Sequence, residues 1–293
     1  MSADKVIYEV LDGGIGRVLI NSPADANAQN AATLYALNDH MLRATHDPAV
    51  KVIILGGVGK HFSSGHDLGQ SDVDIVGKDR PLLSTWGETG IGSIERWYGW
   101  EHEMYLDMCK RWRALAKPTI AQVQGACIAG GLMLAWSCDL IVAAEDAFFQ
   151  DMTIDIGVSG VEFFAHVAEI GPRRAKEKLF TADRWSAQDA LDWGMVNRVV
   201  PREVLQEETL GLARKIASKP MFALKLAKEA VNGCMDSAGF VDGVDRAFAL
   251  HHLSHAHNRI RYDGLILDPA GVPQKIQDSL PGGLRRFPNN PEK

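Results

Sequence analysis

Two glycine-containing loops are the parts of this chain best suited to chemistry. The first covers residues 61–68 (HFSSGHDL) and the second residues 123–132 (VQGACIAGGL). Glycines just before a helix leave backbone N–H groups unpaired and let an anion approach them. Two such loops facing one point would form an oxyanion hole, which stabilises negative charge developing on a carbonyl oxygen. Each loop taken alone can equally be a tight turn selected for packing.

The hydrophobic pattern predicts the elements that would position these loops. The segment 51–57 is almost continuously apolar, which is typical of a strand buried on both faces. Helices are predicted at 30–45 and 132–137. Strands are predicted at 6–10, 17–20, 51–57, 119–124 and 140–144. Strands that alternate with helices in this way predict an α/β fold.

The C-terminal part of the chain is predicted to be mainly helical. The pattern divides the chain into a core over 1–200, a helical region over 201–265 and a Pro- and Gly-rich tail over 266–293. The tail has no apolar periodicity, so we expect it to lie on the surface or on a neighbouring subunit. The predicted helices are 173–180, 187–193, 203–219, 221–234 and 241–260.

Four ordered motifs resemble those of the crotonase (enoyl-CoA hydratase/isomerase) superfamily. The segment 62–68 (FSSGHDL) is similar to its F-x-[AS]-G-x-D-[LI] loop. The segment 124–131 (QGACIAGG), followed by CDL at 138–140, is similar to its second signature. Residues 23–28 and 181–201 resemble two further family segments. The resemblance runs from about residue 5 to 260 and implies a crotonase-type ββα spiral core with C-terminal helices used in oligomerisation.

The resemblance also implies a substrate and an assembly. The substrate would be an acyl-CoA thioester, with coenzyme A as part of the substrate and no separate cofactor. The N–H groups of Ser64 and Gly130 would be the oxyanion donors. The insertion at about 71–117 would lie over the acyl pocket, and the chain would form homotrimers or dimers of trimers. Residues expected to contact coenzyme A are Ala24, Ala26, Ser64, Gly65, His66, Asp67 and Leu68.

The two glutamates of the family's hydratases are missing. Met133 and Thr153 stand at the positions that the resemblance assigns to them, and neither side chain can replace a carboxylate in moving protons. Three nearby acids are candidate replacements: Glu162 first, then Asp155 and Asp151. Each can instead be a helix cap, an ion-pair partner or a solvent-exposed side chain.

Histidines on the last long predicted helix have a spacing that permits metal binding. His251 and His255 are four residues apart, so they share one helix face. The sequence offers no evident carboxylate partner for them. We therefore expect no metal site, and a histidine stripe that faces solvent or another subunit.

Composition excludes several classes of partner. The net charge of −6 argues against nucleic acid, which usually binds to a basic face. No apolar stretch is long enough for a membrane span, and the N-terminus lacks a signal-peptide pattern, so we expect a cytoplasmic protein. Three hypotheses remain: a hydratase or isomerase with atypical acid/base residues, a C–C bond hydrolase or lyase, and a catalytically inactive acyl-CoA binding protein.

Overall fold

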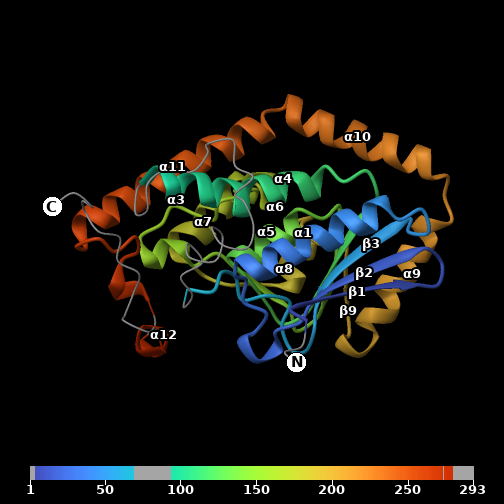
Figure 1. Ribbon diagram of the computed structural model, residues 1–293, viewed down its shortest axis with the longest axis horizontal. Helices are drawn as coiled ribbons and strands as arrows, with labels where there is room; N and C mark the ends of the chain where they lie inside the picture. The colour runs from blue at the N-terminus through green and yellow to red at the C-terminus, as the bar shows by residue number, and fades with distance from the viewer. Residues whose placement is uncertain (1–3, 69–93, 273, 280–293) are drawn as a thin grey trace.

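A six-stranded sheet forms the centre of the molecule (Figure 1). The computed structural model describes residues 4–68, 94–272 and 274–279. Strands β1 and β2 form an antiparallel hairpin, and the remaining neighbours pair in parallel. In sheet order the strands are β1 (Val6–Leu11), β2 (Ile15–Ile20), β3 (Val52–Gly57), β4 (Thr119–Val123), β6 (Leu140–Ala144) and β9 (Arg198–Val200). The predicted α/β arrangement is therefore confirmed.

Helices cover both faces of this sheet. Successive side chains of a strand point to opposite faces, so Ile53 of β3 packs in the core cluster that includes α1 (Ala31–His46). Its neighbour Ile54 packs in a second cluster with α9 (Leu205–Ala217). Burial on both sides explains why this strand is apolar throughout.

A second, smaller sheet carries the second glycine loop. It consists of β5 (Ala126–Ile128), β7 (Phe148–Gln150) and β8 (Trp185–Ser186). Helix α5 (Gly130–Trp136) begins directly after β5. These three strands are so short that the hydrophobic pattern did not predict them.

Three consecutive helical segments lie above the glycine loops. They are α3 (Ile94–Glu101), the π-helix η2 (His102–Asp107) and α4 (Met108–Arg113). They belong to the predicted insertion at 71–117, whose residues 71–93 lie outside the described part of the chain. The remaining short helices of the core are η1 (Pro23–Asp25), η3 (Thr153–Ile156), α6 (His166–Ile170), α7 (Pro172–Thr181), α8 (Ala187–Asp192) and η4 (Arg202–Val204).

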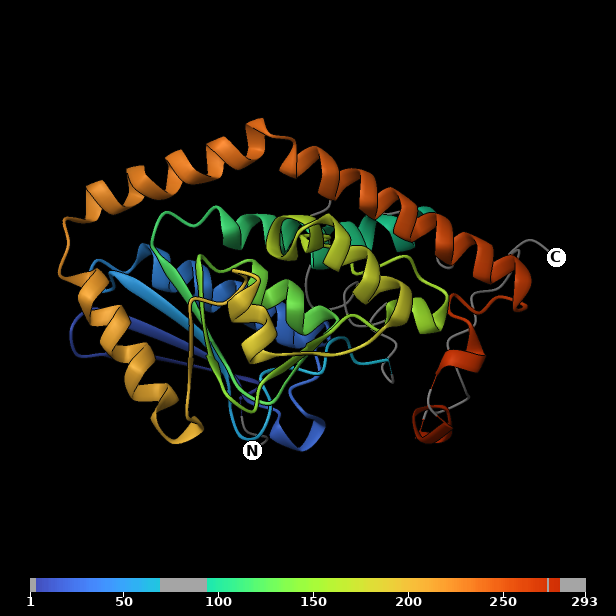
Figure 2. The same cartoon turned by 180° about the vertical axis from the view of Figure 1, so that it is seen from behind.

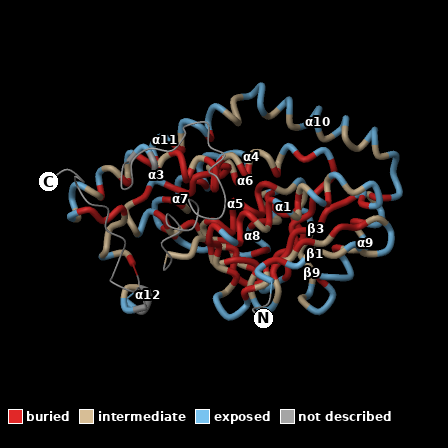
Figure 3. The backbone as a smooth tube through the Cα atoms, viewed as in Figure 1, coloured by how far each residue is buried: buried red, intermediate tan, exposed pale blue. Residues whose placement is uncertain are grey.

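Two long helices extend across one side of the molecule. Figures 1 and 2 show α10 (Met221–Ser237) and α11 (Phe240–Arg261) meeting at a bend, with α11 lying along α3. Helix α10 has no buried residue, and Figure 3 shows it as mainly exposed. Among the described residues, no helix is both long enough and apolar enough to cross a membrane.

The chain after α11 packs more closely than predicted. The pattern indicated a tail over 266–293 that lies on the surface or on a neighbouring subunit, and within it Ile266 and Val272 are buried in this chain. The described part also contains η5 (Pro269–Gly271) and α12 (Gln274–Ser279). The tail boundary stays a prediction, and the structure adds that the chain packs against the core at Ile266 and Val272.

Candidate active site

A cavity of about 490 Å³ lies beside both glycine loops. Its wall is formed by parts of the segments 64–68 and 152–162, by the end of β5, by α3 and α11, and by residues 265–267. An apolar pocket with a few convergent polar groups is the usual form of a small-molecule site. The ionisable side chains in the wall are Asp25, His66, Asp67, Glu101, Tyr105, Glu162, His251 and His255.

The two predicted glycine loops lie side by side. The Ser63 N–H donates to the Ala126 carbonyl oxygen at 3.1 Å, and the Ile128 N–H donates to the Ser63 carbonyl oxygen at 3.0 Å. Gly65 has φ +93°, and a Cβ there would lie 2.8 Å from the Ile128 oxygen. A Cβ on Gly131 would lie 2.6 Å from the Ser63 oxygen. Only glycine allows the two backbones to approach this closely.

Gly130 presents a backbone N–H at the start of α5. Its predecessor Ala129 has φ 48°, a left-handed conformation that is strained for a non-glycine residue and often marks a functional turn. The first N–H groups of a helix have no partner within the helix. Among the residues that the structure describes, none accepts a hydrogen bond from the Gly130 N–H. Gly130 therefore has the geometry needed for its predicted role.

Ser64 does not have the geometry predicted for it. Its N–H donates to the Ala26 carbonyl oxygen at 3.0 Å, so it is engaged within the protein. The Gly65 carbonyl oxygen accepts from the Gln29 N–H at 2.8 Å. The N–H of the same trans peptide belongs to His66 and must point the opposite way, away from Gln29. The His66 N–H is thus better oriented than that of Ser64 to act with Gly130.

The residues predicted to contact coenzyme A are only partly in the cavity wall. Ser64, His66, Asp67 and Leu68 line the cavity. Ala24, Ala26 and Gly65 belong to the adjoining backbone but are absent from the described wall.

Glu162 is the predicted acid/base residue that reaches the cavity. Its side chain is 5% exposed, and its Oε1 lies 3.6 Å from both His66 Nδ1 and His251 Nε2. Burial raises the pKa of Glu162 to about 7, although the positive charge of His251 acts in the opposite direction. A carboxyl group with such a pKa can both accept and donate a proton near neutral pH.

Asp151 and Asp155 do not reach the cavity. Asp151 is buried, where it accepts hydrogen bonds from the N–H groups of Thr153 and Val161 and lies 2.9 Å from His166 Nε2. These contacts fix the loop that carries Glu162. Asp155 is exposed on η3. Neither aspartate lines the cavity, so the structure argues against both as acid/base residues.

The positions of the missing glutamates hold side chains of a different kind. Met133 is buried within α5 and does not line the cavity. Thr153 lines the cavity, but its hydroxyl donates to Asp151 at 2.7 Å. The cavity therefore lacks a carboxylate at either position.

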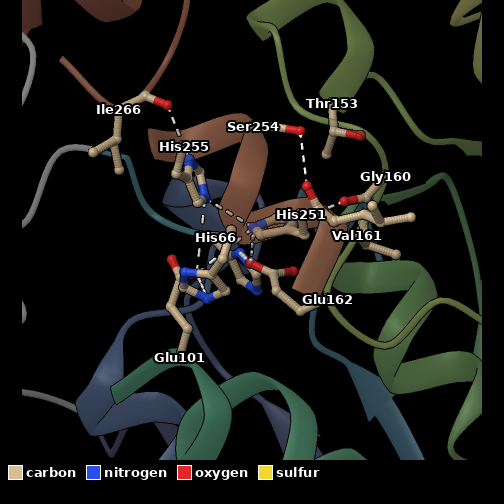
Figure 4. A network of polar contacts seen from close by, with 12 residues as sticks. His66, Glu101, Thr153, Gly160, Val161, Glu162, His251, Ser254, His255 and Ile266 are labelled. Carbon is tan, nitrogen blue, oxygen red and sulfur yellow. Dashed lines mark hydrogen bonds and ion pairs between the residues drawn. The ribbon is translucent and has the colours of Figure 1, made fainter. Parts of the chain in front are cut away.

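A buried cluster of Glu101 and histidines contradicts the predicted stripe facing solvent or another subunit. His251 and His255 of α11 are 3% and 4% exposed and line the cavity, as does Glu101 at the end of α3. Figure 4 shows these three side chains converging with Glu162 and His66. Glu101 could not be assigned to this cluster from the sequence, because it lies about 150 residues from the histidines. Its one signal was a carboxylate within the aromatic run WYGWE at 97–101.

Burial and the neighbouring charges shift the pKa values of the two histidines in opposite directions. Burial lowers the pKa of His251, but Glu162 and Glu101 raise it overall to about 9. Burial and the neighbouring His251 lower the pKa of His255 to about 4. Burial alone would raise the pKa of Glu101, yet the histidines around it hold that pKa well below its ordinary value.

Comparisons with known proteins agree with this architecture. The family model described as enoyl-CoA hydratase/isomerase matches residues 11–79 and 92–265. The chain belongs to the enoyl-CoA hydratase/isomerase family. It is thus a member of the crotonase superfamily, as its motifs indicated.

Individual relatives extend this similarity over most of the chain. A Mycobacterium tuberculosis protein provisionally named enoyl-CoA hydratase EchA13 is 43% identical over 257 residues, which cover 85% of this chain and 80% of that protein. A crystal structure from Mycobacterium smegmatis, titled as a provisional enoyl-CoA hydratase, has 42% identity and a TM-score of 0.80, with 89% of this chain and 98% of that chain covered. An enoyl-CoA hydratase/isomerase structure from Xanthobacter autotrophicus Py2 has 30% identity and a TM-score of 0.75, with 91% and 90% covered. The crotonase-type fold expected from the sequence is therefore confirmed for this family member.

Proposed function

We propose that this enoyl-CoA hydratase/isomerase family member shifts the double bond of an enoyl-CoA through a thioester enolate. The N–H groups of His66 and Gly130 would hold the thioester oxygen and stabilise its negative charge. Glu162 would remove a proton from one carbon of the acyl chain and return it to another. One carboxylate can perform both transfers, so the reaction does not need the second glutamate that this chain lacks.

The position of Glu162 carries this proposal. Among the three acids predicted for this role, it alone lines the described cavity wall, and its Oε1 lies 3.6 Å from the His66 ring. His66 also provides the N–H that is better oriented to act with Gly130. A proton-transfer group and two carbonyl-polarising groups within one pocket are the parts that enolate chemistry requires.

The test is a double-bond isomerisation assay with a 3-enoyl-CoA, followed through absorbance of the conjugated 2-enoyl thioester. We expect turnover by the wild-type protein and a loss of about 10²–10⁴-fold in the Glu162→Gln variant, because an amide cannot transfer the proton. Asp155→Asn is the matched control: its side chain is exposed outside the cavity, so its rate should equal that of the wild type.

Three results would refute the proposal. Glu162→Gln that folds and keeps full activity would exclude the assigned acid/base residue. Hydration of a 2-enoyl-CoA without any isomerisation would assign the protein to the hydratases. Tight acyl-CoA binding by calorimetry without reaction of either ester would favour C–C bond cleavage or a binding role.

The same proposal includes assembly into a homotrimer or a dimer of trimers. Helix α10 has 17 residues and none is buried within its own chain. Large apolar side chains on it are exposed, including Phe222 at 73%, Leu226 at 53% and Val231 at 62%. Burial of such side chains against another subunit would stabilise the helix, since most helical stability in proteins comes from packing of an apolar face.

A further inference from the structure

We propose that Glu101, His251 and His255 form a binding site for a divalent transition-metal ion in the wall of the cavity. The two histidines lie one turn apart on α11, and the glutamate ends α3. Their ligand atoms all lie within 4.8 Å of one another. The site does not depend on the enolate chemistry proposed above.

Backbone carbonyl groups fix the orientation of both imidazoles. His251 Nδ1 lies 2.7 Å from the Gly160 carbonyl oxygen, and His255 Nδ1 lies 2.9 Å from the Ile266 carbonyl oxygen. A carbonyl oxygen only accepts hydrogen bonds, so each Nδ1 must carry the hydrogen. In a neutral imidazole of this tautomer, Nε2 bears a lone pair. Such carbonyl contacts are the usual outer-shell support of metal-binding histidines.

The two Nε2 atoms face each other at 2.8 Å. Two lone pairs cannot lie this close in a buried site unless a cation lies between or beside them. The cation can be a proton on one imidazole or a metal ion bound to both. The buried carboxylate of Glu101, which lies near both Nε2 atoms, distinguishes the proton from the metal ion.

Glu101 favours the metal ion over the proton. Its Oε2 lies 3.6 Å from His251 Nε2 and 3.7 Å from His255 Nε2, and the side chain is 4% exposed. Among the described residues this oxygen accepts no hydrogen bond of good geometry, although His252 Nε2 makes an ion-pair contact with it at 3.1 Å. A proton shared by the imidazoles would leave this buried carboxylate oxygen unsatisfied, at a cost of a few kcal/mol. A metal ion satisfies all three ligand atoms.

The distances suit tetrahedral coordination. With metal–ligand bonds of about 2.0–2.1 Å, tetrahedral ligand atoms lie about 3.3 Å apart. The observed separations of 2.8, 3.6 and 3.7 Å bracket this value, so adjustments of about half an ångström would complete the site. The π-helix η2 begins at His102, directly after Glu101, and π-helical turns are frequent at functional sites.

The site would leave one coordination position open toward the cavity. All three residues line the cavity wall, so a water molecule or a substrate oxygen can complete the coordination. Two imidazoles and one carboxylate suit Zn²⁺ or Fe²⁺ better than Mg²⁺ or Ca²⁺, which prefer oxygen ligands. Zn²⁺ is the appropriate probe because it has no redox chemistry.

The experiment is a titration of chelator-treated full-length protein with Zn²⁺ in competition with a chromophoric chelator. We expect one ion per chain for the wild type, and a loss of affinity of at least 100-fold in Glu101→Gln and in His255→Gln. His257→Gln is the matched control: this histidine is exposed on the same helix, so its affinity should not change.

A second measurement uses the wild-type protein alone, in case the variants do not fold. Co²⁺ in place of Zn²⁺ should give the intense visible absorption of a tetrahedral site. Nitrogen NMR of the imidazoles should show both Nε2 resonances shifted by Zn²⁺ while both Nδ1 atoms stay protonated. The proposal is overturned if no stoichiometric ion binds, if His257→Gln loses affinity equally, or if Zn²⁺ leaves a protonated histidine pair unchanged.

Discussion

Replacing Gly130 by alanine tests the proposed oxyanion hole most directly. The added Cβ would lie 2.6 Å from Cδ2 and Nε2 of the His66 ring and 3.1 Å from Gln29 Oε1. Favourable contacts between such atoms need about 3.5 Å, so the ring or the start of α5 must move by about 1 Å. The ring stacks on Tyr105 with centroids 3.8 Å apart, so it cannot move toward Tyr105.

This movement would separate the two proposed N–H donors while leaving the fold intact. A displacement of about 1 Å at a reacting centre can cost about 10²-fold in rate, and loss of one oxyanion donor costs about 10²–10³-fold. We expect kcat and kcat/KM to fall together by about 10²-fold, since the lost interaction acts in the transition state. The overpacking should cost about 1–3 kcal/mol in stability.

The assay compares isomerisation kinetics and urea unfolding of Gly130→Ala with those of Gly211→Ala. Gly211 lies in α9, where an added Cβ meets no atom within 4 Å. The control should keep wild-type kcat and gain about 0.5–1 kcal/mol in stability, because alanine is the better helix former. A Gly130→Ala protein with wild-type kcat would refute the assignment of Gly130. Equal losses in both variants would show that the effect is not local.

Two further predictions concern stability and assembly. Asp151→Asn should lower the free energy of unfolding by about 3–5 kcal/mol at neutral pH, because it breaks a buried contact with His166. Burial would raise the pKa of Asp151, but His166 and Thr153 lower it overall. The stabilisation by Asp151 is therefore present above its unfolded pKa and is lost as the pH falls through its folded pKa. Urea unfolding with equal pH dependence in the wild type and the variant would contradict this prediction. Phe222→Glu and Leu226→Glu on α10 should reduce the sedimentation coefficient to that of a monomer, and an unchanged oligomer would place the interface elsewhere.

The fold could be predicted where secondary structure depends on local pattern. The apolar run at 51–57 indicated β3 because helices cover both of its faces. The strands β7 and β8 have three and two residues, too few to show a period. They form because segments far apart in the sequence pair with each other, and a short sequence window does not indicate such pairing.

The motif and the structure differ on one proposed oxyanion donor, and the difference has a geometric cause. The motif placed an oxyanion donor at Ser64, but Gly65 has φ +93° and its carbonyl oxygen accepts from the Gln29 N–H, which directs the N–H of His66 away from Gln29. Glu162 reaches the cavity because Asp151 anchors its loop at the Val161 N–H. Spacing along the sequence ranked these acids but could not separate a catalytic carboxylate from one that holds the loop.

The cluster around Glu101 could not be predicted from the sequence because it depends on how two distant helices pack against each other. A pair of histidines four residues apart indicates a shared helix face, but it does not say what that face contacts. Helix α11 lies along α3, and this packing turns His251 and His255 inward toward a carboxylate from a different part of the chain. A buried carboxylate opposite two imidazoles with fixed tautomers needs a cation for its own stability. The identity of that cation decides whether the cavity holds only proton-transfer groups or also a Lewis acid a few ångströms from Glu162.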